Sequence, residues 1–364
     1  MLTTNELKSI LSNLTLSEKV GMLHGDGIFE TKGIKRLGIP DLVTSDGPRG
    51  VRREYIRGTW QDREWSDDSV TYFPANTALA ATWNHELAFE FGDALGAEAR
   101  SRGKDVILAP GVNLMRSPLC GRNFEYMSED PALSGAMGCK VVQGIQQNDV
   151  AACVNHFAAN NQETNRMFVN AIVDKRTLEE MYLPAFRETL VDGNAYSVMA
   201  AYNQLNGDFC CESHYLLTDV LKNQWGYNGV VISDWGGVHS TIKAAKAGLD
   251  IEMGVTTDFD RYFFADALET AVLEGQLDES ILDEKVLGIL QLMNQTHMLS
   301  GQRQKGKRNT PEHQLLTKKI AEEAIVLLEN KEDFYRLRLT STKKYWLLVK
   351  MPLKHMQAVV VAQK

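Results

Sequence analysis

The chain has 364 residues and a mass of 40.7 kDa, which fits two small domains or one α/β barrel of about 250 residues with an extension. Hydrophobic residues make up 44% and charged residues 24%, and this balance excludes a wholly disordered chain. The net charge of −8, from 39 basic and 47 acidic residues, argues against nucleic acid as the main partner.

The sequence shows no sign of export, membrane insertion or metal binding. It has no run of about 18 apolar residues, and residues 1–20 have the pattern of an amphipathic helix rather than a secretory signal. It contains no P-loop and no HExxH motif, and its five cysteines lack zinc-type spacing. The adjacent pair Cys210 and Cys211 suits neither a normal disulfide nor a redox motif. We therefore expect a cytoplasmic protein with reduced, mostly buried thiols and no cofactor or metal.

Six apolar segments, each followed by a polar loop, predict the strands of a parallel sheet. In chain order they are 41–47, 105–114, 150–157, 195–203, 229–235 and 248–254. Continuous apolar runs are typical of strands that are buried on both faces. Helical patterns occupy 84–102, 131–147, 175–192 and 213–225. This alternation over about 250 residues favours an α/β fold, and a (β/α)8 TIM-type barrel in particular.

Polar residues of catalytic type lie at or beyond the carboxyl ends of five of these strands. They are Asp46, Arg122 (further along its loop), His156, Tyr202 and Asp234. In a barrel these ends converge on the face where barrel enzymes keep their active sites. A single residue of this kind could be a helix cap or a core hydrogen bond, but five in consecutive units favour an active site.

The last of these strand ends carries a carboxylate beside an indole, Asp234 and Trp235. That pair suits sugars, because the indole stacks on C–H surfaces and the carboxylate attacks or stabilises an oxocarbenium-like centre. An equal alternative is that Asp234 caps the following helix. Residues 155–166 add a loop dense in amide, imidazole and guanidinium groups, which match sugar hydroxyls, although a polar surface loop has the same composition.

Five segments in register carry a family resemblance. They are SDGPRGVR (45–52), LAPGVNLMRSPLCGRNFEYMSEDP (108–131), NHFAANNQETNR (155–166), AYNQLNG (201–207) and VISDWGG (231–237). They closely resemble the N-terminal barrel domain of glycoside hydrolase family 3, the β-glucosidase and β-xylosidase type, and the resemblance covers roughly residues 5–331. It implies a retaining exo-β-glycosidase that acts on terminal non-reducing sugars.

The resemblance also implies a role for each site residue. Asp234 would be the nucleophile that forms a covalent glycosyl intermediate. The sugar pocket would be built from Asp46, Arg52, Arg122, Asn155, His156, Arg166, Tyr202 and Trp235. Arginine and histidine neighbours would hold the pKa of Asp234 down. The partner is then a carbohydrate, a β-glucoside or a β-xyloside, and the sequence leaves the choice and the oligomeric state open.

One position departs from the family pattern. The family has Lys-His where this chain has Asn155-His156. An asparagine keeps a donor but loses the charge and the reach of lysine, a difference of about 1.5–3 kcal/mol for a charge-assisted bond. We therefore expect weakened sugar binding.

The resemblance divides the chain into a barrel at 1–300, a linker at 301–312 and, at 313–333, the first helix of a second α/β sandwich domain. The family's general acid/base is a glutamate on that second domain, and residues after 300 offer no second catalytic carboxylate. Reading codons for 343–364 in a shifted frame permits KILVIGENATKTYAGGGSS, which resembles the family's continuation. Residues 334–364 are therefore predicted to be an out-of-frame tail, with a genuine divergent tail as the alternative.

Two other functions compete with an active glycosidase. One is a catalytically defective, truncated barrel that at most binds sugar. The other is a barrel lyase or aldolase that uses a lysine imine, which the sequence disfavours because no lysine lies at a predicted strand end.

Overall fold

The computed structural model describes residues 1–64, 69–329, 346–349 and 358–361. The chain divides into two compact units, Met1–Ile325 and Val326–Lys364. In the second unit the described strands β9 (Trp346–Val349) and β10 (Ala358–Val361) pair antiparallel. Most of the predicted out-of-frame tail lies outside the described residues.

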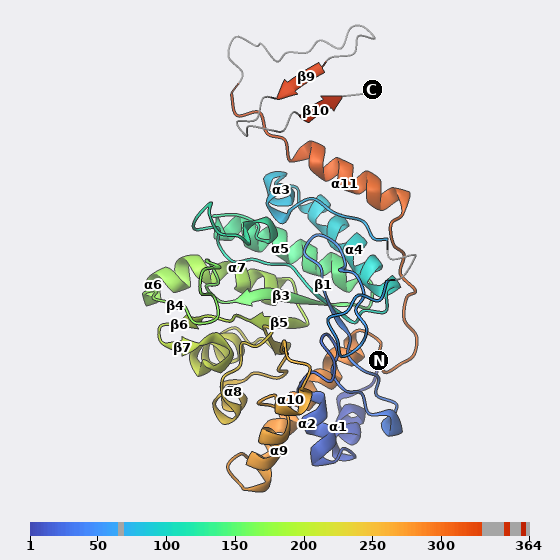
Figure 1. Ribbon diagram of the computed structural model, residues 1–364, viewed down its shortest axis with the longest axis vertical. Helices are drawn as coiled ribbons and strands as arrows, with labels where there is room; N and C mark the ends of the chain where they lie inside the picture. Colours follow the sequence, from blue (N-terminus) through green and yellow to red (C-terminus); the bar gives the residue numbers. More distant parts are fainter. Residues whose placement is uncertain (65–68, 330–345, 350–357, 362–364) are drawn as a thin grey trace. The chain divides into compact units, whose positions relative to one another are not determined.

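Five parallel strands form the central sheet of the first unit, in the spatial order β1-β2-β3-β5-β8. Three of them, β1, β3 and β5, are labelled in Figure 1. Their bounds are β1 (Thr44–Asp46), β2 (Val106–Leu108), β3 (Ala151–Phe157), β5 (Ser197–Ala200) and β8 (Val230–Ser233). All seven residues of β3 are buried, as expected for a strand that is covered on both faces.

The sheet closes into a TIM-type barrel through single bridges. Ile232 pairs parallel with Ile251, and Glu252 pairs parallel with His24. The ring returns to its first strand because the backbone N–H of Thr44 donates to the carbonyl oxygen of Phe29 at 2.7 Å. Strand tips from distant parts of the sequence therefore meet at one end of the barrel.

The predicted strand at 248–254 forms only isolated bridges, because side chains take over part of its ladder. The Asp250 carboxylate accepts the backbone N–H of Val231 at 2.8 Å, and the Ser233 hydroxyl accepts that of Met253 at 2.8 Å. These bonds satisfy the backbone without regular pairing. A (β/α)8 barrel has eight regular strands. Among the described residues, the barrel of this chain consists of five regular strands and of segments joined by single bridges.

The predicted helices are present with changed bounds. The first two are α4 (His85–Ser101) and α5 (Pro131–Gln146). The third, predicted at 175–192, is broken into α6 (Lys175–Thr177), η3 (Leu178–Tyr182), α7 (Pro184–Arg187) and η4 (Glu188–Asp192), and the fourth is η6 (Tyr215–Gln224). The segments η3, η4 and η6 have π-helical hydrogen bonding.

Helices α4 and α5 pack closely because glycines lie at their crossing. A Cβ atom on Gly92 would be 2.2 Å from the carbonyl oxygen of Val141, and one on Gly144 would be 2.2 Å from that of Phe89. No side chain fits at either position without moving a helix backbone. This contact holds the helical layer against β2 and β3, whose ends carry site residues.

The remaining elements complete the first unit. The helices are α3 (Asn76–Ala81), α8 (Thr241–Ala247), α9 (Asp266–Leu273) and α10 (Glu279–Gln295), and the short strands are β4 (Asn170–Ala171), β6 (Gln204–Leu205) and β7 (Asp208–Phe209). The predicted single helix in the first 20 residues is two helices, α1 (Thr4–Ser12) and α2 (Leu16–Met22). Each has its own capping box, from Thr3 with Glu6 and from Thr15 with Glu18, and the second box starts a new helix.

Residues 301–323 pack on the barrel unit, so the predicted boundary at residue 300 differs from the structure. Glu98, a fully buried side chain of α4, accepts the backbone N–H of Asn309 at 2.9 Å, and its Oε1 lies 2.7 Å from Nδ1 of His313. Helix α11 (Pro311–Glu323) starts two residues before the predicted position and ends ten residues before the predicted end at 333. The compact unit continues to Ile325 because a buried carboxylate needs these donors.

We expect limited proteolysis to cut the chain just after this unit. Ile325, Leu327 and Leu328 are 81%, 59% and 93% exposed and lie outside any helix or strand. Low chymotrypsin should therefore release a resistant fragment that ends near residues 325–328, identified by mass spectrometry. His313→Ala removes the contact between this side chain and Glu98, so cleavage should move towards residue 302. Cleavage near residue 300 in the unaltered chain would contradict this boundary.

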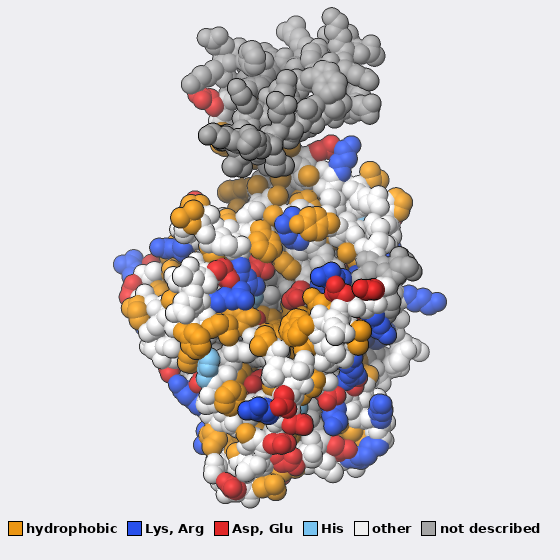
Figure 2. Space-filling view, viewed as in Figure 1, with side chains coloured by type: hydrophobic (Ala, Val, Ile, Leu, Met, Phe, Trp, Pro, Cys, Tyr) orange, Lys and Arg blue, Asp and Glu red, His pale blue; other side chains and the backbone are white. Residues whose placement is uncertain are grey.

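The surface of the barrel unit is mixed in character. Acidic, basic and hydrophobic side chains are interspersed over the face shown in Figure 2. Among the described residues, no helix has the length and apolarity needed to cross a bilayer. The cysteines are free, and all are buried except Cys120, which is partly exposed.

Candidate active site

The predicted site residues lie at the carboxyl ends of the barrel strands. Asp46 ends β1, His156 lies near the end of β3, and Tyr202 and Asp234 follow β5 and β8. Arg122 comes from the long loop after β2, where it precedes the short helix η2 (Asn123–Glu125). Because the strands are parallel, these side chains gather at one end of the barrel.

Asp234 is buried, with 5% of the residue exposed. Its Oδ1 accepts the backbone N–H of Trp235 at 2.8 Å. Its Oδ2 lies 3.7 Å from Nε2 of His156 and makes no hydrogen bond to any described residue. One carboxylate oxygen is therefore fixed by the backbone, and the other remains available for chemistry.

Burial raises the pKa of Asp234 to about 6, although Arg122, the Tyr202 hydroxyl and the Trp235 N–H act in the opposite direction. The expectation that its neighbours would hold this pKa down is therefore wrong. The desolvation of the charged form outweighs the nearby positive charge. Asp234 is still mostly ionised at pH 7, as a nucleophile must be.

His156 does not help to lower that pKa because it is neutral. Burial, together with Arg122 and Arg166, holds the pKa of His156 well below its usual range. Nη2 of Arg122 lies 2.7 Å from Nε2 of His156. A guanidinium can only donate, so Nε2 must be the unprotonated acceptor.

Two glutamates hold the arginines of the site. Arg122 forms an ion pair with Glu125, and its Nε lies 4.0 Å from Oε1 of Glu163. Arg166 donates to Oε2 of Glu163 at 2.7 Å, and its guanidinium lies 4.8 Å from the centre of the Tyr202 ring. Both glutamates lie inside recognised motifs, but their roles depend on how two loops meet, which spacing in the sequence does not reveal.

A cavity of about 660 Å³ opens beside this network and is bordered by Asp46, Arg52, Arg122 and Arg166. Its size lies within the range of about 300–1,000 Å³ that is typical of small-molecule sites. Asp46 has a side chain that is 57% exposed, and its Oδ2 is 3.9 Å from Nε of Arg52. The Asp46 carboxylate is thus free to accept hydrogen bonds from a ligand in the cavity.

Aromatic side chains contact two of the predicted site residues, Arg52 and Trp235. The Arg52 guanidinium lies 3.5 Å from the centre of the Phe29 ring, and the Trp235 and Phe29 rings are 5.1 Å apart. Trp235 is 7% exposed, and its indole N–H donates to the carbonyl oxygen of Ile28 at 2.7 Å. The segment with Ile28 and Phe29 was not predicted, because nothing in its composition marks it as part of a site.

Asn155 does not border this cavity, and neither do His156, Tyr202, Asp234 and Trp235. It is 5% exposed, and its amide nitrogen donates to the carbonyl oxygen of Leu108 at 3.1 Å. Its Oδ1 makes no hydrogen bond to a described residue. The Asn155 amide is therefore bonded within the barrel, and its predicted role in sugar binding stays a prediction.

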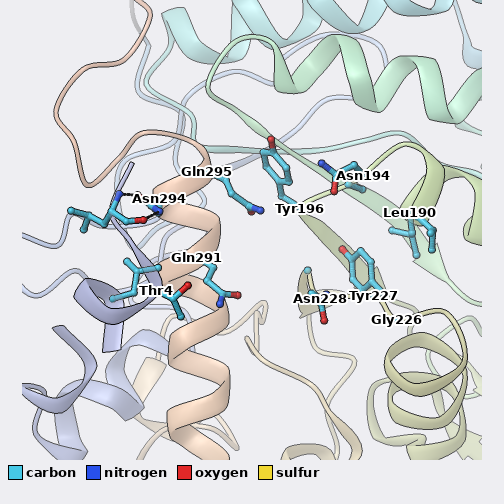
Figure 3. A pocket seen from close by; sticks show the side chains of 15 residues that line it. Thr4, Leu190, Asn194, Tyr196, Gly226, Tyr227, Asn228, Gln291, Asn294 and Gln295 are labelled. Carbon is cyan, nitrogen blue, oxygen red and sulfur yellow. Dashed lines mark hydrogen bonds between the residues drawn. The ribbon is translucent and has the colours of Figure 1, made fainter. Parts of the chain in front are cut away.

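A second cavity lies near the opposite, amino-terminal ends of β5 and β8 (Figure 3). It measures about 300 Å³ and is bordered by Asn194 and Tyr196 before β5, by Tyr227 and Asn228 before β8, and by Gln291 and Gln295 of α10, among others. None of its lining residues is charged or is a histidine or cysteine. It offers no acid, base or strong nucleophile. The cavity beside Asp46 is the candidate active site because the predicted site residues Asp46, Arg52, Arg122 and Arg166 border it.

Comparisons with known proteins identify the family of this chain. Residues 30–292 match the model of the glycosyl hydrolase family 3 N terminal domain. Beta-glucosidase BoGH3A of Bacteroides ovatus is 43% identical over 333 residues, which are 89% of this chain and 44% of that protein. Thermostable beta-glucosidase B of Acetivibrio thermocellus is 41% identical over 345 residues, with 93% and 44% covered.

Solved structures of beta-glucosidases also match this chain. Beta-glucosidase 3B from Thermotoga neapolitana, in complex with glucose, superposes with a TM-score of 0.83 at 40% identity and covers 90% of this chain and 48% of that one. The chain thus spans less than half the length of the relatives that it matches. The family model, the identities and the shared barrel together show that this chain belongs to glycoside hydrolase family 3.

Proposed function

We propose that this chain carries the nucleophile and the sugar pocket of a retaining, exo-acting β-glucosidase-like enzyme. The observation that carries the proposal is the carboxylate of Asp234, fixed through Oδ1 and unpaired at Oδ2 at the catalytic end of the barrel. Membership of a family that includes named beta-glucosidases supports the substrate class. A glucoside is favoured over a xyloside because solved relatives hold glucose.

The pocket geometry suggests how a sugar would bind. A non-reducing sugar in the cavity would donate hydroxyl hydrogens to the exposed carboxylate of Asp46. Arg122 and Arg166 border the same cavity and would donate hydrogen bonds to the oxygens of the sugar. Such bonds hold the anomeric carbon in place, which is the entropic part of catalysis.

Asp234 would then attack the anomeric carbon through Oδ2. The bond from the sugar to the carboxylate forms while the bond to the leaving oxygen breaks, and that oxygen must gain a proton. Water later attacks the glycosyl-enzyme, loses a proton to a base and releases the sugar with its configuration retained. Arg122 lowers the pKa of Asp234 and so favours the ionised, nucleophilic form.

The acid/base for these proton transfers is proposed to lie on a further part of a longer protein. The other carboxylates described at the site, those of Asp46, Glu125 and Glu163, each pair with an arginine and so help to position the cations of the site. Burial raises the pKa values of Asp46 and Glu125, so the proposal rests on the length of the relatives and not on the protonation of these carboxyls. The relatives are more than twice as long as their matched part. The second candidate function, a barrel that binds sugar without efficient turnover, is favoured by the cavity beside Asp46, because Asp234 does not border it.

Mechanism-based labelling tests the proposal directly. An activated 2-fluoro β-glucoside, whose good leaving group needs no acid, should form a stable glycosyl ester on Asp234. Peptide mass spectrometry should find the added mass on that residue alone. Labelling of Asp46, Glu125 or Glu129 would mean that the pocket is right and the nucleophile is wrong, and binding of glucose without any labelling would favour the second candidate.

A further inference from the structure

A buried tyrosine lies behind the site histidine. Tyr126 and His156 are 0% and 1% exposed, and their rings meet edge to face with centroids 6.3 Å apart. The Tyr126 hydroxyl is 3.4 Å from Nδ1 of His156. Tyr126 follows the helix η2 in the same loop as Arg122, so this loop reaches both nitrogens of the imidazole.

The direction of each proton in this contact follows from its other partners. The Tyr126 hydroxyl donates to the backbone carbonyl of Asn160 at 3.0 Å. Burial also raises the pKa of Tyr126 well above its usual value, so the phenol keeps its proton. Its oxygen therefore offers lone pairs to the amide of Asn113, at 3.4 Å, and to Nδ1 of His156.

The two ends of the imidazole agree on one tautomer. Nε2 faces the guanidinium of Arg122, which can only donate, so Nε2 carries no hydrogen. A neutral ring then carries its hydrogen on Nδ1, where the Tyr126 oxygen accepts it. Asn113 fixes the backbone as well, by donating to the carbonyl oxygen of His156 at 2.9 Å.

This tautomer matters because Nε2 lies 3.7 Å from the free Oδ2 of Asp234. A hydrogen on Nε2 would point to that oxygen after a small movement and donate to it. Such a bond stabilises the ionised carboxylate and makes it a weaker nucleophile. With a lone pair on Nε2 the imidazole does not donate to Oδ2, and the Tyr202 hydroxyl remains as the side chain whose hydrogen bonding lowers the pKa of the carboxylate.

We propose that Tyr126 is a positioning residue that holds His156 in the Nδ1–H tautomer and thereby keeps Oδ2 of Asp234 free to attack the sugar. The effect on attack rests on the proposed role of Asp234, whereas the tautomer does not. Arg122 has other acceptors in Glu125 and Glu163, so it does not hold the tautomer alone. In the Tyr126→Phe variant the buried Nδ1–H loses its acceptor, which favours the opposite tautomer.

The tautomer can be read by NMR on the full chain labelled with 15N-histidine. Protonated and unprotonated ring nitrogens give well separated 15N shifts, and His156→Gln identifies the signals of interest among eight histidines. In the unaltered chain Nδ1 of His156 should carry the proton. In Tyr126→Phe the ratio of the Nε2–H form to the Nδ1–H form should rise about fivefold or more.

The matched control is Tyr227→Phe, which removes another buried tyrosine hydroxyl. Tyr227 is 6% exposed, and its hydroxyl makes no hydrogen bond to a described residue. This variant should leave the His156 signals unchanged. A proton on Nε2 in the unaltered chain overturns the proposal, even if Tyr126→Phe does not fold, and so does a tautomer shift of equal size in both variants.

Labelling by the 2-fluoro glucoside completes the test. Tyr126→Phe should label Asp234 several-fold more slowly than the unaltered chain, and Tyr227→Phe should label it at the same rate. A shifted tautomer with an unchanged labelling rate overturns the link to attack. If the unaltered chain is not labelled but its tautomer shifts as expected, the role of Asp234 fails while the positioning of His156 by Tyr126 stands.

Discussion

Asp234→Asn is expected to lower the rate of hydrolysis of an activated aryl β-glucoside by at least about 10³-fold, the usual cost of removing a nucleophile. The amide has nearly the same size and can keep the bond from the N–H of Trp235 to its oxygen. It cannot form the glycosyl ester, because the amide lacks the charge of Oδ2. Release of the aryl group by the variant and the unaltered chain, at equal concentration, measures the loss.

Sugar binding should survive the same substitution. Asp46, Arg122 and Arg166 border the cavity and are unchanged, so glucose should bind Asp234→Asn within a few-fold of its affinity for the unaltered chain. Asp46→Asn should show the reverse pattern, with weakened binding and an intact nucleophile. Asp192→Asn, on an exposed carboxylate at the end of η4, is the control and should change neither quantity. A full rate in Asp234→Asn would show that another group attacks the sugar.

Asp234→Asn should also be more stable than the unaltered chain at neutral pH. The folded protein binds the proton of Asp234 more tightly than the unfolded chain, so the free energy of unfolding falls as pH rises from about 4 to about 6. A rise of the pKa from 3.8 to about 6 corresponds to about 3 kcal/mol, which the ionised carboxylate costs the fold at pH 7.5.

Urea unfolding at two pH values tests this sign. Asp234→Asn should gain up to about 3 kcal/mol at pH 7.5 and much less at pH 4.5, where the native carboxyl is already protonated. The labelling rate of the unaltered chain should rise with pH around 6 for the same reason, since only the ionised form attacks. A variant that is less stable at pH 7.5 would mean that the charge is compensated in the fold.

The strand tips could be predicted because they follow a simple physical pattern. A run of buried apolar residues that ends in a polar one, as at Asp46, His156 and Asp234, marks a strand leaving the core at the catalytic end of a barrel. The motif resemblance then assigned roles to these residues. What the sequence could not give was the balance of forces at Asp234, because burial and nearby charge act on its pKa in opposite directions.

Contacts between loops that are distant in the sequence could not be predicted. The Trp235 indole donates to the carbonyl oxygen of Ile28, and the Tyr126 hydroxyl contacts Nδ1 of His156. Both contacts form between loops that meet only after the barrel closes. The same limit applies to α11, whose docking depends on the buried Glu98. A helical pattern extends past Glu323, but helix propensity alone does not bury residues 324–329, and the helix stops there.

The second large effect concerns the leaving group. If the acid/base lies outside these 364 residues, as we propose, turnover should depend steeply on how easily the leaving oxygen departs. General acid catalysis contributes about 10²–10⁴-fold, so an alkyl glucoside or cellobiose should lose about that factor relative to a longer family enzyme that carries the acid. A dinitrophenyl glucoside should lose far less in the first step, because its leaving group needs no proton.

The second step should show the missing base. Water attacks the glycosyl-enzyme slowly without a base, so the dinitrophenyl substrate should give a burst of one equivalent followed by slow turnover. Azide needs no base, and it should speed that turnover and yield glucosyl azide. The azide effect should disappear in Asp234→Asn, because no glycosyl ester forms there for azide to attack. Equal turnover of cellobiose and the dinitrophenyl substrate, without a burst and without an azide effect, would show that the described barrel carries its own acid/base, and Glu163 and Glu125 would then be the carboxylates to replace first.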